Sequence, residues 1–302
     1  MERTEELEMF RIALEIADLH PDVITLPVNR QVIVDSMRLR YLDWGGSGTP
    51  ILFLHGGGLT AHTWDYVAVM LREGYRCVAL DQRGHGDSEW SPVVDYRIAA
   101  HLRDIEGFVD ATGLKSPILV GQSMGGLNSI AYATRNSASM RAMVIVDVAP
   151  EVSPSGAERI REFAATPELD SPQAFLERAV KFNQLRDPAM LRRSLYYNLR
   201  ETPGGKWVFK HDQRRRSDDA LRSFTEDRAR FTSEVSKIKV PTLVVRGALS
   251  DVLTHSAAEE FACSLPDGRL IEVEKSGHNV QGDNPRALVD AILAFFREAR
   301  IS

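Results

Sequence analysis

The 302-residue sequence is poor in cysteine, in long apolar runs and in excess charge of either sign. Its two cysteines, Cys77 and Cys263, match no metal-binding or redox spacing, so a disulfide framework is excluded and reduced packing residues are expected. No apolar run approaches the roughly 18 residues that a membrane-spanning helix needs. The acidic N-terminal stretch also lacks the basic-then-apolar order of a secretory signal, so we expect a cytoplasmic protein with no membrane partner.

The charge pattern gives no reason to expect a nucleic-acid partner. The net charge is -5 at pH 7, and the one basic run, residues 214–216, is flanked by Asp212, Asp218 and Asp219. This run is interpreted as a solvated, locally neutralised surface. The eight histidines include no H-E-x-x-H or comparable ligand spacing, which predicts that there is no metal site. The sequence does not fix an oligomeric state and leaves a homodimer open.

Short apolar runs alternate with helical patterns along most of the chain. Strand patterns cover residues 30–35, 38–44, 51–54, 75–81, 116–121, 141–150, 240–247 and 268–277. An amphipathic helix is expected over residues 5–19, others lie between the strands, and a final helix begins at Pro285 with Asn284 as its cap. This alternation predicts an α/β protein with a mostly parallel sheet and helices on both faces.

The alternation is interrupted between residues 151 and 234. This stretch has helical patterns with many charges and aromatic residues but no convincing buried strand. We therefore expect an α/β core formed by residues 1–150 and 235–302, with 151–234 inserted as a helical cap. The insertion enters at the carboxyl end of a core strand, which is where ligands bind in open α/β sheets.

The stretch GQSMGG, residues 121–126, joins an expected strand to an expected helix. Gly121 and Gly125 flank Ser123 in the G-x-S-x-G pattern of a nucleophile elbow, where the serine hydroxyl projects above the sheet. The alternatives are a plain tight turn or a phosphate-binding loop. The sequence has neither G-x-G-x-x-G nor a Gly-Lys-Ser/Thr ending, so a nucleotide site lacks support.

A serine nucleophile needs a histidine base and a carboxylate that orients the base. After a nucleophile elbow these follow in the order serine, acid, histidine. Asp251 and His278 fit that order, and each follows an expected strand. Asp147 fits the order as well, but we expect it to be a structural or pocket-lining residue. For the oxyanion, the expected donors are the backbone amides of Gly57 and Met124.

Five stretches in this order resemble the α/β-hydrolase superfamily: HGGG at 55–58, DQRGHGDS at 81–88, GQSMGG at 121–126, RGALSD at 246–251 and SGHNVQGDNP at 276–285. The resemblance implies an eight-stranded, mostly parallel sheet, a Ser123, Asp251 and His278 triad, no cofactor, and a lid formed by residues near 151–234. It says little about the substrate. Relatives that act on haloalkanes or epoxides carry an aspartate at the elbow, so Ser123 favours acyl chemistry. The DQRGHGDS loop is interpreted as structural.

We therefore expect a serine hydrolase that cleaves a small or medium carboxylic ester or lactone through an acyl-enzyme. One alternative is a carbon–carbon bond or amide hydrolase with the same triad, and another is a non-catalytic ligand receptor on the same scaffold. The expected partner is a small acyl substrate. The candidate substrate-binding residues are Gly58, His62, Trp64, Asp147, Phe182, Tyr196 and Val280.

Overall fold

The computed structural model of the chain describes residues 2–216 and 234–301, and its centre is an eight-stranded sheet. In spatial order the strands are β1 (Val28–Val34), β2 (Met37–Gly45), β4 (Arg76–Leu80), β3 (Pro50–Leu54), β5 (Ile118–Gln122), β6 (Ala142–Val146), β9 (Thr242–Gly247) and β10 (Gly268–Val273). The pairs β1–β2 and β2–β4 are antiparallel and the other five are parallel. The α/β prediction of a mostly parallel, eight-stranded sheet is confirmed.

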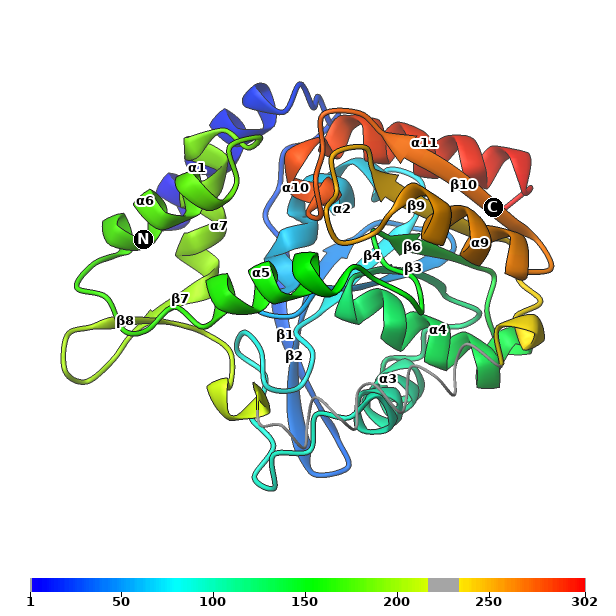
Figure 1. Ribbon diagram of the computed structural model, residues 1–302, viewed down its shortest axis with the longest axis horizontal. Coiled ribbons are helices and arrows are strands. Elements are labelled where there is room, and N and C mark those ends of the chain that lie inside the picture. Colours follow the sequence, from blue (N-terminus) through cyan, green and yellow to red (C-terminus); the bar gives the residue numbers. More distant parts are fainter. Residues whose placement is uncertain (1, 217–233, 302) are drawn as a thin grey trace.

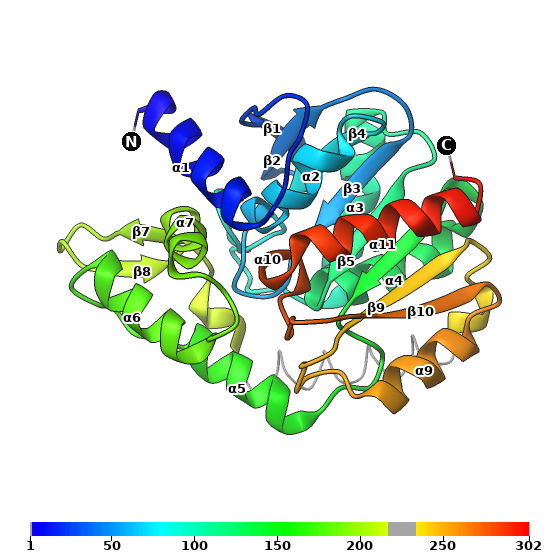
Figure 2. The same ribbon diagram turned by 90° about the horizontal axis from the view of Figure 1, so that it is seen from above.

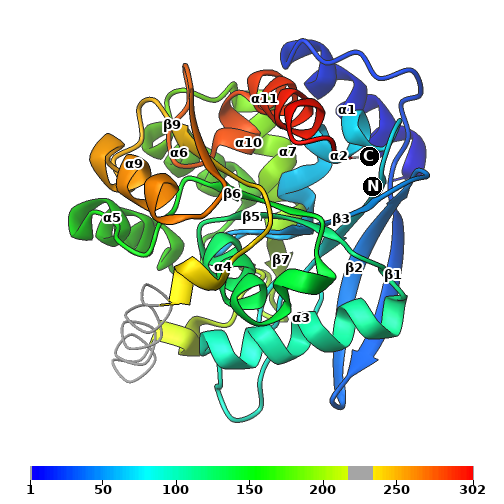
Figure 3. The ribbon, with the colours of Figure 1, turned by 90° about the vertical axis from the view of Figure 1, so that its right-hand side faces the viewer.

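Helices cover both faces of this sheet (Figure 3). One face packs against α1 (Arg3–Ile16), α2 (Asp65–Leu71) and α11 (Pro285–Glu298), and the other against α3 (Ile98–Thr112), α4 (Met124–Asn136) and α9 (His255–Ser264). Strand residues alternate between the two layers, as a pleated strand requires: Phe53 of β3 joins the first core and Leu54 the second. The short helices are η1 (Ala61–Trp64), η2 (Ser137–Ser139), η3 (Gln213–Arg216), η4 (Val235–Lys237) and α10 (Val280–Asp283).

The last helix begins where the sequence predicts, whereas the first helix ends earlier than expected. The Asn284 side chain accepts a hydrogen bond from the Ala287 amide at 3.2 Å, and Pro285 occupies the first turn of α11. The N-terminal helix ends at Ile16, three residues before the expected limit of 19, and the turn that follows has Asp18 at a positive φ of 51°. Among the described residues, no helix is both long enough and apolar enough to cross a bilayer.

Between β6 and β9 the chain leaves the sheet and builds a separate group of elements, which we call the cap segment (Figures 1 and 2). It consists of α5 (Pro154–Ala164), α6 (Pro172–Phe182), α7 (Pro188–Asn198) and a hairpin of β7 (Leu199–Glu201) and β8 (Trp207–Phe209). Each helix begins with a proline after a capping side chain, from Ser153, Ser171 and Asp187 respectively. The segment has its own apolar core, which includes Phe175, Leu195 and Phe209.

The expected helical character of this insertion is seen in α5, α6 and α7, but the hairpin was not expected. Its strands are three residues long, too short to give a recognisable alternating pattern in the sequence. Residues 217–233 of the expected insertion lie outside the described residues, as does part of the expected acidic flank of the 214–216 run.

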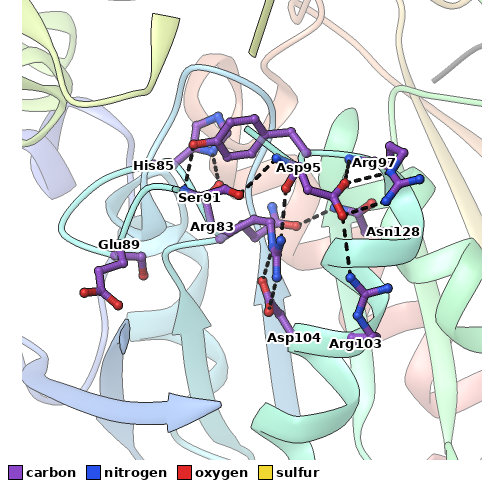
Figure 4. Close-up of polar contacts among 12 residues, drawn as sticks. Arg83, His85, Glu89, Ser91, Asp95, Arg97, Arg103, Asp104 and Asn128 are labelled. Carbon is purple, nitrogen blue, oxygen red and sulfur yellow. Dashed lines mark hydrogen bonds and ion pairs between the residues drawn. The ribbon is translucent and has the colours of Figure 1, made fainter. Parts of the chain in front are cut away.

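The DQRGHGDS loop after β4 is tied to the core by buried polar contacts. Arg83 donates through Nε and Nη2 to the Asp104 carboxylate of α3 at 2.5 and 2.7 Å, and through Nη1 to the Asp95 carbonyl at 3.0 Å (Figure 4). The Asp81 carboxylate accepts from the Ala61 and Asp87 amides at 2.6 and 3.0 Å. These contacts support the structural interpretation of the loop.

Candidate active site

The parallel strands at the centre of the sheet end together, and their register brings distant residues side by side. Gln122 of β5 pairs with Val146 of β6, and Val146 pairs with Val245 of β9. The Ser123 amide donates to the Val146 carbonyl at 3.1 Å, and the Asp147 amide donates to the Val245 carbonyl at 2.7 Å. Ser123 and Asp147 are therefore neighbours at the carboxyl edge of the sheet.

Ser123 occupies the sharp turn between β5 and α4. Its backbone has φ 52° and ψ -118°, outside the regions that most residues adopt, and such strain persists only where the surrounding structure enforces it. A Cβ on Gly125 would stand 2.1 Å from the Leu54 carbonyl oxygen, so only glycine lets α4 start this close to β3. The expected elbow geometry is present, with the serine at the positive end of α4.

His278 lies on the loop between β10 and α10 and contacts a buried carboxylate. Its Nδ1 is 2.8 Å from Oδ2 of Asp147, whose side chain is fully buried. Two neutral donors also hold this carboxylate: the Gly247 amide reaches Oδ1 at 2.8 Å and the Ser250 hydroxyl reaches Oδ2 at 2.6 Å. A carboxylate at Nδ1 keeps the proton there and leaves Nε2 to accept one, which is the arrangement that a general base needs.

This geometry corrects the expected position of the acid. The carboxylate at His278 belongs to Asp147, whereas Asp251 forms an ion pair with Arg159 of α5, with Nε and Oδ2 2.7 Å apart and 43% of the Asp251 side chain exposed. The reason is the register: Asp147 directly follows the end of β6, but Asp251 lies four residues beyond Gly247, the last residue of β9.

The loop that follows β3 supplies the expected oxyanion side of the site. Gly57 and Gly58 line the same cavity as Ser123 and His278, and Gly58 has a positive φ of 83° that suits glycine. Met124, the other expected donor, directly follows Ser123 and is the first residue of α4, at the positive end of that helix. His55, at the start of this loop, is held in place by the Gln82 amide, which donates to its Nε2 at 3.0 Å.

Ser123 and His278 line a small cavity of about 80 Å³ beneath the cap segment, which we call the serine cavity. Its cap wall is mostly apolar and comes from Ile160, Phe163, Ala164, Ala179, Phe182, Leu191, Leu195 and Phe209. Polar side chains from Asn183, Arg186, Ser194 and Asn198 interrupt this wall. The cavity thus combines a hydroxyl, an imidazole, a glycine loop and an apolar lining at one point.

The candidate substrate-binding residues divide into two groups. Gly58 and Phe182 line the cavity, and Asp147 touches His278 instead of the cavity wall. The other four lie elsewhere. Trp64 and Val280 are fully buried in the core, Tyr196 is 46% exposed, and His62 pairs with Asp65 at 2.9 Å. Trp64 and His62 belong to η1, which turns away from the cavity after Leu59.

A larger cavity of about 790 Å³ lies on the other side of α7, between the cap segment, α1 and the start of the sheet. His62 and Tyr196 line it. The two cavities share Leu195, and between them Thr60 donates from Oγ1 to Oδ1 of Asn198 at 2.9 Å. Leu195 and this hydrogen bond form a partition that keeps the serine cavity small.

Two polar residues that contact the candidate triad, Gln122 and Ser250, were not expected from the sequence. Gln122, the fully buried residue before Ser123, donates from Nε2 to the His278 carbonyl at 3.0 Å and lies 3.2 Å from His278 Nε2. Ser250 holds Asp147. One signal in the sequence points to this arrangement: Asp147 follows its strand as directly as Ser123 follows β5. Within residues 2–216 and 234–301, no three His, Cys, Asp or Glu side chains gather to hold a metal ion.

Comparison with known proteins agrees with this fold. Residues 49–285 match the family model of the alpha/beta hydrolase fold, and the chain belongs to that family. It is 34% identical over 259 residues to Esterase Rv0045c of Mycobacterium tuberculosis, covering 83% of this chain and 84% of that protein. A crystal structure of that esterase superposes with a TM-score of 0.77 at 31% identity, covering 98% and 99% of the two chains.

A second solved structure, E-2-(acetamidomethylene)succinate hydrolase, has a TM-score of 0.78. It is 22% identical to this chain and covers 90% of it and 99% of its own length, so it supports the fold alone. The sequence-based family resemblance is confirmed.

Proposed function

We propose that the protein is a serine hydrolase that cleaves a small carboxylic ester or lactone, with Ser123, His278 and Asp147 as its catalytic residues. The observation that carries the proposal is the buried Asp147–His278 contact of 2.8 Å, next to a strained serine in a cavity that both Ser123 and His278 line. The 34% identical relative is named an esterase, which supports ester substrates.

In the proposed reaction Ser123 Oγ attacks the substrate carbonyl while its proton moves to His278 Nε2. The oxyanion of the tetrahedral intermediate accepts hydrogen bonds from the Gly57 and Met124 amides. When the carbon–oxygen bond breaks, the leaving alcohol takes the proton from Nε2. A water molecule then gives a proton to Nε2 and attacks the acyl carbon. As the bond to Ser123 Oγ breaks, Nε2 returns that proton to Oγ and the acid is released. Asp147 holds the imidazole throughout.

The cavity and the cap segment set the size of the substrate. The cavity volume of about 80 Å³ is well below the roughly 300–1,000 Å³ of most small-molecule sites. We propose that the cap segment acts as a lid and that the partition at Leu195 restricts the site to short acyl groups, with the apolar wall favouring an uncharged chain.

A panel of nitrophenyl esters of increasing acyl length, with lactones, thioesters and amides beside it, tests this function. Short esters should turn over fastest, and Ser123→Ala should lower kcat by at least about 10³-fold with the unfolding temperature unchanged. A fluorophosphonate probe should label the wild type and not Ser123→Ala. The matched control is Ser256→Ala, an exposed serine of α9. Full activity in Ser123→Ala, or no labelling of the wild type, would contradict the proposal.

A further inference from the structure

Three consecutive residues of the loop that carries His278 are each held through the backbone by a different side chain. The Gly277 amide donates to Oδ2 of Asp283 at 3.0 Å, the His278 carbonyl accepts from Gln122 at 3.0 Å, and the Asn279 carbonyl accepts from Nη2 of Arg186 at 3.2 Å. Gln122 belongs to the sheet and Asp283 to α10, but Arg186 comes from the cap segment, between α6 and α7. The position of the imidazole therefore depends on the cap as well as on the core.

Arg186 and Asp283 form a buried ion pair. Oδ1 of Asp283 accepts from Nε and Nη2 of Arg186 at 3.0 and 2.9 Å, and from Nδ2 of Asn183 at 2.8 Å. The two charged side chains are 7% and 1% exposed. A pair with so little solvent around it tolerates the loss of one partner poorly, because the other charge is then left buried without compensation.

The close approach of Arg186 depends on the glycine beside Asp283. A Cβ at Gly282 would lie 2.2 Å from the central carbon of the guanidinium, so this side chain can lie across α10 only where residue 282 is glycine. Arg186 and Asn183 also line the serine cavity, next to His278 and Asn279. One ion pair thus touches the cavity wall and the His278 loop at the same time.

We infer that Arg186 and Asp283 are a pair of positioning residues that couples the seating of the cap segment to the placement of His278. With the cap in place, Arg186 anchors the Asn279 carbonyl and Asp283 anchors the Gly277 amide, so Nε2 is fixed for proton transfer from Ser123. When the pair is broken, the cap and the imidazole lose their common anchor. This inference rests on the proposed function of Ser123 and His278.

A second contact between the cap and the core offers a natural contrast. Arg159 of α5 and Asp251 also join the cap segment to the core, but their side chains are 48% and 43% exposed and they bind no backbone group of residues 277–279 in the described structure. Solvent weakens such a pair. It ties the same two parts of the molecule without holding the histidine.

The test compares Arg186→Met, Asp283→Asn and the double variant with the wild type on a short nitrophenyl ester. Each single variant leaves one buried charge and should be both less stable and slower. The double variant removes both charges and should recover much of the lost stability, yet its kcat should stay about 10- to 100-fold low because the reacting groups are misplaced. Its KM should change by less than about threefold because the substrate-binding contacts remain.

Labelling of Ser123 by a small fluorophosphonate should slow in parallel with kcat, since the probe also needs His278. Arg186→Lys keeps the charge but loses the guanidinium that reaches both Asp283 and Asn279. It should fold like the wild type, and its kcat should be roughly several-fold lower because His278 is misplaced. The control Arg159→Met should stay within about twofold in kcat.

The inference is overturned if the folded double variant or Arg186→Lys keeps wild-type kcat and labelling, or if Arg159→Met slows the enzyme equally. Failure of the proposed function would look different, because the wild type itself would then resist the probe.

Discussion

Within the part of the chain that the structure describes, two buried aspartate–histidine pairs in different regions have nearly the same geometry. In the candidate active site, His278 Nδ1 is 2.8 Å from Oδ2 of Asp147, and in η1 and α2, His62 Nδ1 is 2.9 Å from Oδ2 of Asp65. Both pairs fix the imidazole through the same nitrogen. They differ in what surrounds the second nitrogen and the carboxylate.

At the second pair, charged and aromatic groups contact both the imidazole and the carboxylate. Nε2 of His62 lies 3.1 Å from the Arg40 guanidinium, the His62 ring stacks on Tyr197 with centroids 3.5 Å apart, and the Asp65 carboxylate binds Nη2 of Arg193 at 2.6 Å. At the first pair, Nε2 of His278 meets the neutral Gln122 amide and the cavity that Ser123 also lines. An aspartate beside a histidine therefore does not define a base, because the surroundings of Nε2 decide whether it can accept a proton.

The second pair works instead as an anchor between the cap segment, α1 and the core. Arg193 of α7 is buried, pairs with Asp65, and lies over the rings of Phe10 and Tyr197 with centroid distances of 4.3 and 5.0 Å. Burial would raise the pKa of the Asp65 carboxyl, but its interactions with His62 and Arg193 outweigh burial and hold that pKa below its usual range. Asp65 therefore stays ionised in the folded protein.

Among the variants that separate the two pairs, Arg193→Met should have the largest effect on stability. Arg193→Met leaves Asp65 buried without its cation, so we expect the free energy of unfolding to fall by about 3–5 kcal/mol, measured by urea denaturation. The matched control is Arg159→Met, which breaks the exposed pair with Asp251 and should cost about 0–1 kcal/mol. Equal losses in the two variants would show that the Arg193 cluster is no special anchor.

A smaller effect should appear in the pH dependence of stability. Burial lowers the pKa of His62 from 6.5, against the pull of Asp65, so the folded protein binds a proton there less readily than the unfolded chain does. Stability should therefore rise with pH through the range just below 6.5 and be lost as the pH falls.

In His62→Gln the free energy of unfolding should rise less steeply with pH, by up to the contribution of about one proton, when unfolding in urea is followed between about pH 5 and 7.5. An unchanged slope in the variant would place the pH dependence in other groups.

The fold and half of the candidate site could be predicted from the sequence, because the signals are local. Short apolar runs define the strands, and the spacing of Gly121, Ser123 and Gly125 defines the elbow in one short stretch. The final helix was correctly placed for the same reason, since Asn284 and Pro285 mark its start directly.

The carboxylate partner could not be chosen because it depends on which strands pair and in what register. Asp147 and Asp251 both lie after Ser123 and before His278, and only the pairing of β5, β6 and β9 shows which one reaches the imidazole. The pocket lining is similarly non-local: Trp64 and Val280 are close in sequence to site residues yet pack into the core. Gln122 occupies one of the unspecified positions of the G-x-S-x-G pattern, and Arg186 lies in none of the quoted motifs.

The most direct test of the account compares Asp147→Asn with Asp251→Asn in kcat/KM for a short nitrophenyl ester. With Asp147 as the orienting carboxylate, Asp147→Asn should lose about 10³- to 10⁴-fold in the folded protein because the tautomer of His278 is no longer fixed. Asp251→Asn, which weakens only an exposed ion pair, should stay within about threefold. The opposite ranking, with Asp251→Asn inactive and Asp147→Asn near the wild type, would contradict the assignment.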